Sequence, residues 1–380
     1  MDYTTQRLGF RLKKVLRYFR LYGIARTLTK VKGQFHMKRK YEIMPAERKI
    51  SQSSYAHIGI IGCGNFVFSN VAFYLNKFNP GLIRGVMDID IHRAASLFES
   101  YGAIYYTNNA DKIISDDDID LVYIASNHAS HAEYAIRCIQ AGKHVHIEKP
   151  HVVSEDQLLR LVSAMRNNPQ SKVFLGYCRP RTRLFQTLKA LLMKESGPLM
   201  INWFIAGHEI PDNHWYFDEK EGGRVLGNLC HWTDLTLHLV GIENAFPCHI
   251  IPSSPPTSKS DFIVSLIFAD GSCVSITFSA KGHTFEGVRE VLNIHKGNLL
   301  GNLTDFQSLA VEVVENKIVS RRWYRDHGHK INILNSLNSR HGEDIRYIIA
   351  TAKLFLAIRA ALESGSRLTL SRDDALGIFL

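Results

Sequence analysis

Long apolar runs are missing from this chain of 380 residues. None approaches the roughly 20 residues that a helix needs to cross a bilayer, so the sequence predicts no transmembrane segment. Cysteine is sparse, and neither a C-x-x-C pair nor a zinc-type spacing occurs. We therefore expect no metal site, and reduced thiols in a cytoplasmic protein. The six cysteines stand at positions 63, 138, 178, 230, 248 and 273.

Acidic residues are scarce at one end of the chain. Residues 1 to 50 contain 14 Lys and Arg against 3 Asp and Glu, a net charge of +11, whereas the other 330 residues carry a net charge of −1. The formal +10 of the whole chain therefore comes from this N-terminal arm. The remainder has the composition of an ordinary soluble protein and is long enough for two domains with sizeable cores.

The arm, residues 1–54, begins with a predicted basic amphipathic helix. An apolar stripe recurs at helical spacing, and the basic residues lie largely away from it. The stripe consists of Leu8, Leu12, Val15, Leu16 and Phe19. One interpretation is attachment to an anionic membrane surface, or to a polymer or lipid-linked substrate made there. The other is that the stripe packs on the protein's own catalytic domain or on a partner subunit.

Two other functions of the arm are disfavoured. Residues 1 to 50 contain no serine, which argues against a transit peptide. No helix-turn-helix or aromatic RNA-binding motif accompanies the positive charge, so we expect no nucleic-acid partner. The polar segment Pro45 to Ser54 lacks periodicity and is predicted to be a linker.

A glycine-rich turn follows the first apolar strand, His57 to Ile61. Gly62 permits a tight turn, and Gly64 lets the backbone approach a pyrophosphate held at the N-terminus of the next helix, Ser69 to Lys77. Val67 stands at the third glycine position, so we expect a slightly wider contact between strand and helix.

An acidic residue, Asp88, ends the next apolar run, Leu82 to Met87. A carboxylate at this place accepts both ribose hydroxyls of an adenosine and repels a 2′-phosphate, so NAD is favoured over NADP. Arg93 is near enough in sequence to leave that choice open.

The stretch Leu121 to Pro150 predicts a strand, a helix and a second strand. Leu121 to Ala125 is apolar, Ala129 to Ala141 has helical spacing, and His144 to Ile147 is again a strand. Glu148-Lys149-Pro150 then lies at the carboxyl end of that strand, where open α/β sheets bind their ligands. Regular alternation of strands and helices predicts a doubly wound parallel sheet.

This tripeptide, together with the segments GKHVHI and HASHAEYA before it, resembles the Gfo/Idh/MocA family of glucose-fructose oxidoreductases, inositol dehydrogenases and their relatives. The resemblance runs from about Tyr55 to Gly241. It implies a Rossmann domain over residues 55–178, followed over residues 179–380 by an α+β domain with a largely antiparallel open sheet that binds substrate and forms dimers or tetramers.

The resemblance also implies roles for residues of the first domain. Besides Gly62, Gly64 and Asp88, it implies cofactor contacts for Asn65, Phe66, Ser126, Asn127, His131 and Glu148. For His131 a structural role is favoured over a catalytic one. Lys149 is the expected catalytic residue, since a strand-end ammonium can stabilise the substrate alkoxide as hydride leaves its carbon. The alternative is that Lys149 pairs with Glu148 and braces the loop.

Candidate substrate residues of the second domain are more scattered. Arg179 matches the arginine found at the start of the family's substrate domain and suits an anionic substrate group. His208 and Trp215 flank a polar and aromatic loop suited to a sugar, although a plain surface loop is an equal alternative.

The segment from Gly222 to Asp234 is the second family match. It resembles a branch with the pattern G-R-x-x-G-[E/N]-x-x-H-x-x-D, often met beside surface-polysaccharide biosynthesis. The match implies that His231 handles the hydroxyl proton, with Asn228 beside the substrate. Asp234, one helical turn after His231, is expected to hold its imidazole in one tautomer. Gly227 stands where many relatives have an acidic residue or asparagine.

The sequence thus predicts an NAD(H)-dependent oxidoreductase acting on a secondary hydroxyl or keto carbon of a sugar or nucleotide-sugar, with Lys149 and His231 as its proton-handling pair. Two alternatives stay open. One is an enzyme that retains NAD and catalyses no net redox reaction, such as a glycosidase or a sugar-sugar oxidoreductase. The other is a catalytically silent, cofactor-bound sensor or scaffold. We expect the protein in the cytoplasm, with peripheral binding to the inner membrane surface through the arm as one option.

Overall fold

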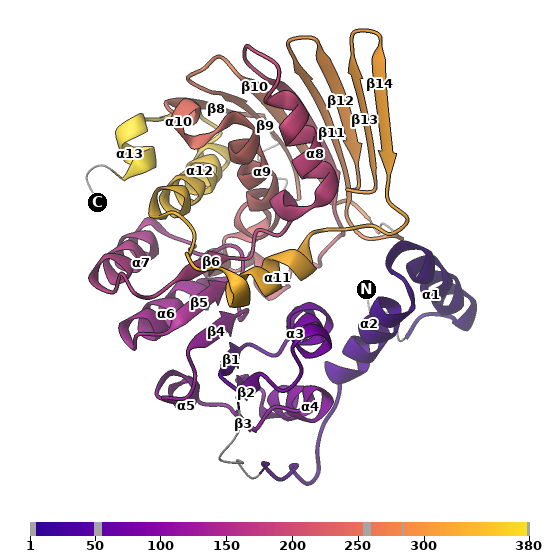
Figure 1. Ribbon diagram of the computed structural model, residues 1–380, viewed down its shortest axis with the longest axis vertical. Coiled ribbons are helices and arrows are strands. Elements are labelled where there is room, and N and C mark those ends of the chain that lie inside the picture. The colour runs from indigo at the N-terminus through magenta and orange to yellow at the C-terminus, as the bar shows by residue number, and fades with distance from the viewer. Residues whose placement is uncertain (1–4, 49–54, 254–259, 283–284, 378–380) are drawn as a thin grey trace. The chain divides into compact units, whose positions relative to one another are not determined.

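The computed structural model describes residues 5–48, 55–253, 260–282 and 285–377, and it divides into two compact units (Figure 1). Unit 1 holds the arm and the first domain, and unit 2 holds most of the remainder. Unit 1 comprises Met1–Val152, Asp156–Gly176 and His329–Glu343, and unit 2 comprises Val153–Glu155, Tyr177–Gly328 and Asp344–Leu380.

The centre of unit 1 is a six-stranded sheet in the order β3-β2-β1-β4-β5-β6. Every neighbouring pair is parallel, and most strand residues are buried because helices cover both faces. This is the predicted doubly wound Rossmann sheet. Its strands are β1 Ile58–Ile61, β2 Ile83–Met87, β3 Tyr105–Thr107, β4 Leu121–Ile124, β5 His144–Ile147 and β6 Val173–Leu175.

The helices between these strands end where the sequence has caps. Asp90 accepts a hydrogen bond from the His92 N–H at the start of α4, and Gly102 closes that helix with a positive φ of 74°. A π-helical turn, Val67–Val71, precedes α3. The helices of unit 1 are α1 Leu8–Tyr22, α2 Ile24–His36, α3 Ala72–Phe78, α4 Ile91–Tyr101, α5 Ala110–Ile114, α6 His128–Gln140, α7 Glu155–Asn167 and α11 His329–Asn338.

Helix α11 belongs to unit 1 although it lies far along the chain. The predicted boundaries 1–54, 55–178 and 179–380 place this helix in the second domain instead. The Tyr123 hydroxyl donates to the Ile333 carbonyl at 2.7 Å, and His146 Nδ1 lies 2.7 Å from Ser336 Oγ. Ile333 joins the core of unit 1. A helix of unit 1 is therefore supplied by sequence that follows strand β14 of the second sheet.

The arm forms two helices, α1 and α2, rather than one. Helix α2 packs on the Rossmann sheet's helices: the Arg26 guanidinium donates to Asn70 Oδ1 at 2.5 Å, and a Cβ added to Gly33 would lie 2.3 Å from Asn65 Oδ1. Of the predicted linker, Pro45–Arg48 is neither helix nor strand, and residues 49–54 lie outside the described residues.

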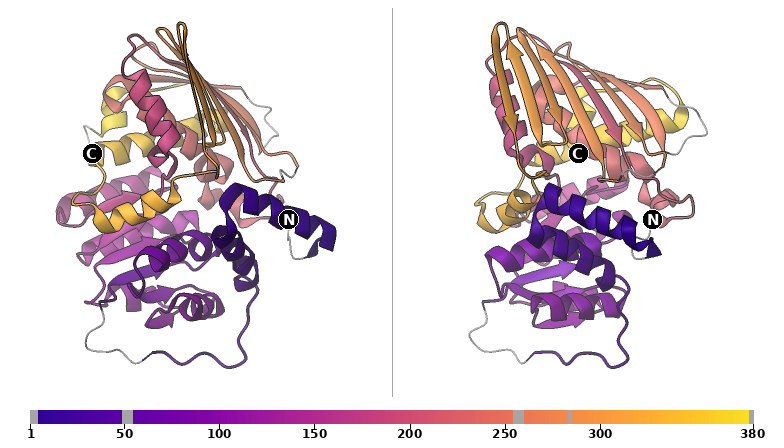
Figure 2. Two further views of the ribbon diagram at one scale, coloured as in Figure 1. Left: turned by 45° about the vertical axis from the view of Figure 1, so that its right-hand side comes forward. Right: turned by 90° about the vertical axis from the view of Figure 1, so that its right-hand side faces the viewer.

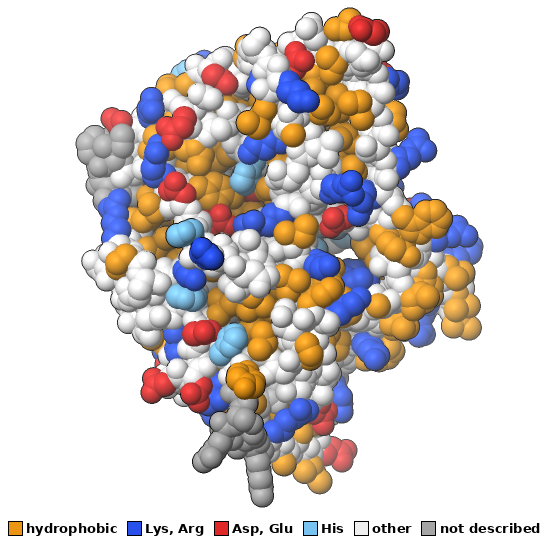
Figure 3. All heavy atoms as spheres, viewed as in Figure 1, with side chains coloured by type: hydrophobic (Ala, Val, Ile, Leu, Met, Phe, Trp, Pro, Cys, Tyr) orange, Lys and Arg blue, Asp and Glu red, His pale blue; other side chains and the backbone are white. Residues whose placement is uncertain are grey.

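The apolar stripe of α1 does not pack on the protein's own domain in the way one interpretation expected. Leu8, Leu12 and Leu16 are 67%, 55% and 61% exposed, whereas Lys14, predicted on the solvated side, is only 6% exposed. Hydrophobic side chains accordingly gather on the surface of the arm, with Lys and Arg around them (Figure 3). In the part of the chain that the structure describes, no helix is long and apolar enough to span a membrane.

Unit 2 is built on a nine-stranded sheet in the order β14-β13-β12-β11-β7-β10-β9-β8-β15. Within the described part of this sheet only β7 and β10 pair in parallel, so the predicted, largely antiparallel sheet is confirmed. The strands are β7 Met200–Ala206, β8 Cys248–Ser253, β9 Asp261–Ile267, β10 Cys273–Ser279, β11 Arg289–Lys296, β12 Leu299–Thr304, β13 Ser308–Val313, β14 Asn316–Arg321 and β15 Leu368–Leu370.

Helices cover one face of this sheet and leave the other open (Figure 2). In β7, Ile201, Trp203 and Ile205 point into the core, while Met200 and Phe204 are exposed. The alternation is that of a sheet with one buried face. The helices of unit 2 are α8 Arg183–Leu192, α9 Cys230–Val240, α10 Ile242–Ala245, α12 Ile345–Ser364 and α13 Arg372–Leu376.

Candidate functional site

The glycine turn after β1 is fixed by close backbone approach. Gly62 has a φ of +93°, and a Cβ added there would lie 2.5 Å from the Ala125 carbonyl oxygen, so only glycine fits. At Gly64 an added Cβ would meet no atom within 4 Å. The backbone at Gly64 is therefore open on the side where a bound group can approach it.

Asp88 holds the same turn from the end of β2. Its Oδ2 accepts the Cys63 N–H at 2.7 Å, and its Oδ1 accepts the Asp90 N–H at 2.9 Å. Burial and this carboxylate raise the pKa of the Cys63 thiol well above its ordinary value. The thiol therefore stays protonated and acts as packing.

The first helical turn after the glycines is wider than an α-helix. The sequence predicts wider spacing where Val67 replaces the third glycine, and the π-helical turn Val67–Val71 begins at that residue with its side chains buried. The neighbouring side chains serve contacts within unit 1. Asn65 lies against Gly33 of α2, and the Phe66 ring lies edge-on to His329 of α11 with centroids 5.5 Å apart.

Three loops meet at the carboxyl edge of the sheet. Ile61, Ile124 and Ile147 are paired neighbours in β1, β4 and β5. The loops that follow them therefore start side by side at the same edge of the sheet. These loops carry Gly62, Ser126 and Lys149. A dinucleotide laid across this edge would reach the glycine turn, the β4 loop and the β5 loop in sequence.

His131 joins two of these loops. Its Nδ1 lies 2.8 Å from the Pro150 carbonyl oxygen, and its Nε2 lies 3.2 Å from the Ser126 carbonyl oxygen. Burial lowers the pKa of His131, so the ring is neutral and its single N–H serves the shorter contact, to Pro150. The favoured structural role agrees with these contacts. Asn127 is the N-cap residue of α6, and its Oδ1 accepts from Ser130 Oγ at 2.5 Å.

Glu148 and Lys149 differ in their surroundings. The Glu148 carboxylate lies inward: its Oε2 would be 2.6 Å from a Cβ on Gly176, and its Oε1 lies 3.7 Å from His146 Nε2. Lys149 is half-buried at the strand end. Cofactor contact by Glu148 and catalysis by Lys149 stay predictions, but of the two side chains Glu148 has the packed, structural position.

In unit 2, His231 lies near the start of α9 and is largely buried. The Tyr177 ring stands edge-on to it, with centroids 6.1 Å apart. The contacts described for Asp234 are with the Tyr347 hydroxyl, which donates to Oδ1, and with His238 Nε2 at 3.7 Å. The expected orientation of His231 by Asp234 therefore stays a prediction.

Arg224, to which the sequence interpretation gave no role, gathers several predicted substrate residues. Its guanidinium donates to the His208 carbonyl and, at 3.1 Å, to Asn228 Oδ1. It also lies 5.9 Å from the centre of the Tyr216 ring, next to the exposed Trp215. The motif Gly222–Asp234 contains this arginine. Its contact with the carbonyl of His208, 16 residues earlier in the chain, is visible only in the folded structure.

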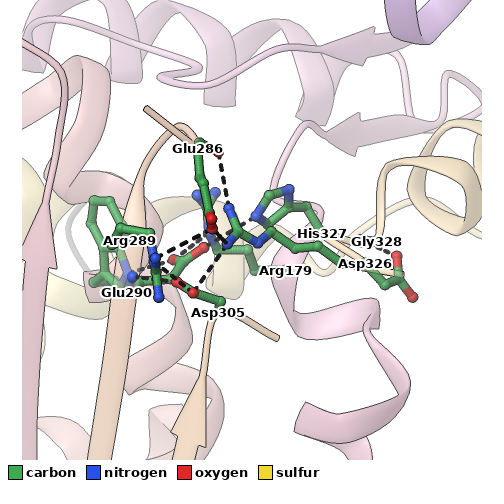
Figure 4. Close-up of polar contacts among 10 residues, drawn as sticks. Arg179, Glu286, Arg289, Glu290, Asp305, Asp326, His327 and Gly328 are labelled. Carbon is green, nitrogen blue, oxygen red and sulfur yellow. Dashed lines mark hydrogen bonds and ion pairs between the residues drawn. The ribbon is translucent and has the colours of Figure 1, made fainter. Parts of the chain in front are cut away.

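Arg179 belongs to a buried ionic cluster (Figure 4). Its Nε donates to Glu290 Oε2 at 2.8 Å, and the Trp232 Nε1–H donates to the same oxygen at 2.9 Å. Burial alone would raise the pKa of Glu290, but the charge of Arg179 and the nearby His327, whose Nε2 lies 3.5 Å from Glu290 Oε1, hold it at about 2. The described contacts of Arg179 are structural, and substrate binding by this residue stays a prediction.

Further ion pairs extend this cluster. Arg325 donates to Asp305 and to Glu286, each at 3.1 Å, and Arg289 Nε lies 2.7 Å from Asp305 Oδ2. The Glu290 N–H donates to Asp305 Oδ1 at 3.0 Å. The cluster thus joins the start of β11, the loop before β13 and the segment before α11.

Comparison with known proteins matches part of unit 1 to an oxidoreductase family. Residues 56–177 match the model of an oxidoreductase family with an NAD-binding Rossmann fold. The chain is 35% identical over 201 residues to Oxidoreductase P35 of Formosa agariphila, covering 49% of this chain and 61% of that protein. It is 27% identical over 208 residues to inositol 2-dehydrogenase 2 of Saccharopolyspora erythraea, covering 54% and 60%. The chain thus spans about 60% of the length of these two relatives.

Solved structures share the fold over most of this chain. Levoglucosan dehydrogenase, in complex with NADH and levoglucosan, matches with a TM-score of 0.70 and 17% identity, over 83% of this chain and 99% of that one. The WlbA dehydrogenase from Chromobacterium violaceum, in complex with NADH and UDP-GlcNAcA, matches with a TM-score of 0.68 and 17% identity, over 86% and 99%. At this identity the likeness shows the fold.

Replacing Glu290 by Ala leaves the buried Arg179 charge without its carboxylate. We expect the free energy of unfolding of unit 2 to fall by about 3–5 kcal/mol. Urea unfolding followed by tryptophan fluorescence measures it, because all four tryptophans, at 203, 215, 232 and 323, lie in unit 2. Glu312→Ala, which removes an exposed ion pair with Lys317, is the control and should cost less than about 1 kcal/mol. Equal effects would contradict a stabilising role of the cluster.

Proposed function

We propose that this chain, whose residues 56–177 match the model of the Gfo/Idh/MocA oxidoreductase family, is a member of that family and an NAD(H)-dependent dehydrogenase of sugars or nucleotide-sugars. The observation that carries the proposal is the row of loops at the carboxyl edge of β1, β4 and β5. This row places an open glycine turn, a polar loop and the half-buried Lys149 at the same edge of the sheet. NAD, when bound there, supplies or accepts the hydride.

NAD is the proposed form of the cofactor because Asp88 ends β2. A carboxylate at this position accepts ribose hydroxyls, and its negative charge opposes a 2′-phosphate. Asp88 is already fixed by two backbone N–H groups, so it needs little reorganisation to bind a ribose.

Lys149 and His231 divide the proton chemistry. The Lys149 ammonium donates a hydrogen bond to the substrate oxygen and stabilises negative charge on it when the carbon loses hydride. His231 takes the hydroxyl proton in the oxidative direction and returns it in reduction. Tyr177 and Trp232 enclose the His231 ring, which limits its motion.

A sugar or nucleotide-sugar is the substrate class that suits the unit 2 residues. Arg224 fixes His208, Asn228 and the aromatic loop through contacts to a carbonyl, an amide and a ring. Side-chain amides and imidazoles hydrogen-bond sugar hydroxyls, and an exposed Trp215 ring can stack on a sugar face. Structural neighbours crystallised with levoglucosan and with UDP-GlcNAcA support the same class.

We also propose that the open face of the nine-stranded sheet joins two copies of the chain. Met200, Phe204 and Leu300 are exposed apolar residues on it. Its amides satisfy one another: Asn302 Nδ2 donates to Asn293 Oδ1 at 2.8 Å, and Asn202 Nδ2 donates to Ser275 Oγ at 2.8 Å. Polar groups that are already paired cost little to remove from water.

The arm supports a second proposal, peripheral binding of a cytoplasmic enzyme to the inner membrane surface. Its exposed apolar residues Leu8, Leu12 and Leu16 lie on a segment with a net charge of +11. Such a surface suits anionic lipid headgroups and repels a second copy of itself.

The catalytic proposal is tested by NADH absorbance with a panel of nucleotide-sugars, hexoses and inositols. One substrate should give steady turnover, and Lys149→Ala should lower its rate by about 10²–10⁴-fold. Lys112→Ala, at an exposed ion pair with Glu47, is the matched control and should leave the rate unchanged. A flat trace from protein that carries stoichiometric NAD would instead support the non-redox enzyme. A flat trace without cofactor binding would contradict both enzyme hypotheses.

Self-association is tested by sedimentation of Phe204→Glu. A buried charge at an apolar contact should convert the oligomer to monomer, because desolvating an unpaired carboxylate is costly. Leu159→Glu, at an exposed leucine of α7, should leave the oligomer intact. A wild-type protein that sediments as a monomer would refute the proposed contact.

Membrane binding is tested by co-sedimentation with vesicles of phosphatidylglycerol or of phosphatidylcholine. We expect binding to the anionic vesicles only, weakened more than about tenfold by Leu12→Glu together with Leu16→Glu, since each leucine contributes roughly 1.5–3 kcal/mol on burial. Leu159→Glu with Met193→Glu, at exposed positions in α7 and just after α8, is the control. Binding that is equal in all three proteins would contradict the role of the arm.

A further inference from the structure

A pocket of about 460 Å³ lies within unit 1, between α2 of the arm and α4. Its floor is aromatic: His36 stacks on Phe68 with ring centroids 4.4 Å apart. Burial lowers the pKa of His36, so the ring is neutral. Its Nε2 donates to the Cys63 carbonyl at 2.7 Å, and its Nδ1 then accepts from Ser96 Oγ at 2.9 Å. The floor is thus uncharged and held on both sides.

The rim of the pocket is cationic. Lys32 and Lys38 come from the arm, and Arg39 follows them with an ion pair to Glu99 at 2.8 Å. Three basic side chains therefore line the pocket, and the Glu99 carboxylate contacts one of them, Arg39. Ser100 of α4 forms part of the opposite wall, and its hydroxyl donates to the Ser96 carbonyl at 2.7 Å.

The apolar surface of the arm runs into this pocket. Ile24, Leu28 and Val31 are exposed along α2 at spacings of three and four residues, and Phe35 follows them, 57% exposed, as a lining residue of the pocket. A ligand that reaches the cationic rim along this stripe meets apolar side chains first. Its chemistry must therefore combine an apolar chain with an anionic group.

We propose that this pocket binds the phosphate group of an anionic membrane lipid. The phosphate lies against Lys32, Lys38 and Arg39, and the first chain carbons lie on Phe35 and Phe68. A volume of about 460 Å³ is in the range of small-molecule sites, roughly 300–1,000 Å³. The proposal goes beyond the dehydrogenase reaction and does not depend on it.

The pocket also borders the proposed cofactor site. His36, which forms its floor, is hydrogen-bonded to the carbonyl of Cys63, and Cys63 lies between the two glycines of the turn. A bound lipid would thus touch the residue that holds the turn from the arm side.

The test uses calorimetry on the full chain with dihexanoyl phosphatidic acid below its micelle concentration, and with glycerol 3-phosphate as the headgroup without chains. Ser100→Glu places a carboxylate in the pocket wall without altering the arm. We expect the short-chain lipid to bind and this variant to weaken it by about tenfold or more, because like charges repel in a confined site. Ser115→Glu is the matched control, since Ser115 also donates to the carbonyl four residues before it, at 2.7 Å, and is exposed.

Each other outcome overturns the proposal. Glycerol 3-phosphate binding as tightly as the lipid would show a site for free phosphate. If Ser100→Glu and Ser115→Glu lowered the affinity for the lipid equally, the pocket would not be the lipid site. The absence of lipid binding would exclude the site as well. Thermal melting of both variants verifies that they fold. The titration contains neither NAD nor sugar. A negative result for lipid binding therefore says nothing against the dehydrogenase proposal.

Discussion

The glycine turn of unit 1 is fixed through the backbone of one residue, Cys63. Asp88 of β2 accepts its N–H, and His36 of α2 donates to its carbonyl. Beside it, Gly62 lies so close to the Ala125 carbonyl that no side chain fits. The turn is therefore held by the second strand, by the arm and by the loop after β4, while Gly64 stays open. A cofactor-binding turn held in this way has little conformational entropy left to lose on binding.

The second unit uses buried polar contacts for the same purpose. Arg224 anchors the residues proposed to meet a sugar, and the cluster around Glu290 holds the start of β11 against Arg179 and Trp232. Such groups are costly to bury and must be satisfied together, so they specify one arrangement. The proposed substrate residues are thereby placed by contacts that need not touch the substrate.

Sequence periodicity and end signals predicted the local elements well. The strand His144–Ile147 has the expected bounds, and the expected helix Ala129–Ala141 differs from α6 by one residue at each end. Long-range partners could not be predicted. Helix α11 contacts Tyr123 and His146 across about 200 residues of sequence. The Tyr347 hydroxyl donates a hydrogen bond to Asp234, 113 residues earlier. The sequence of strand β14 does not predict a strand, because its residues, at an exposed edge, lack the apolar alternation of a half-buried strand.

In the arm, the buried face of a helix differs from the face that the sequence pattern suggests. Its apolar stripe was recognised, but the helix face that is buried carries Lys14, whose ammonium lies 4.9 Å from the centre of the Tyr18 ring. Aromatic rings can thus cover a lysine stem while leucines stay exposed. Helical spacing identifies an amphipathic helix, but it does not tell which face the folded protein covers.

The most direct test of the account is the binding of NADH and NADPH to the wild-type protein and to Asp88→Asn, measured by calorimetry. The asparagine keeps one acceptor oxygen, for the Cys63 N–H, and removes the charge together with the acceptor for the Asp90 N–H. We predict that the wild-type protein binds NADH at least about tenfold more tightly than NADPH, and that the variant loses most of this preference, because the carboxylate repels the 2′-phosphate. Equal affinity of the wild-type protein for both nucleotides, or binding of neither, would contradict the proposed cofactor site.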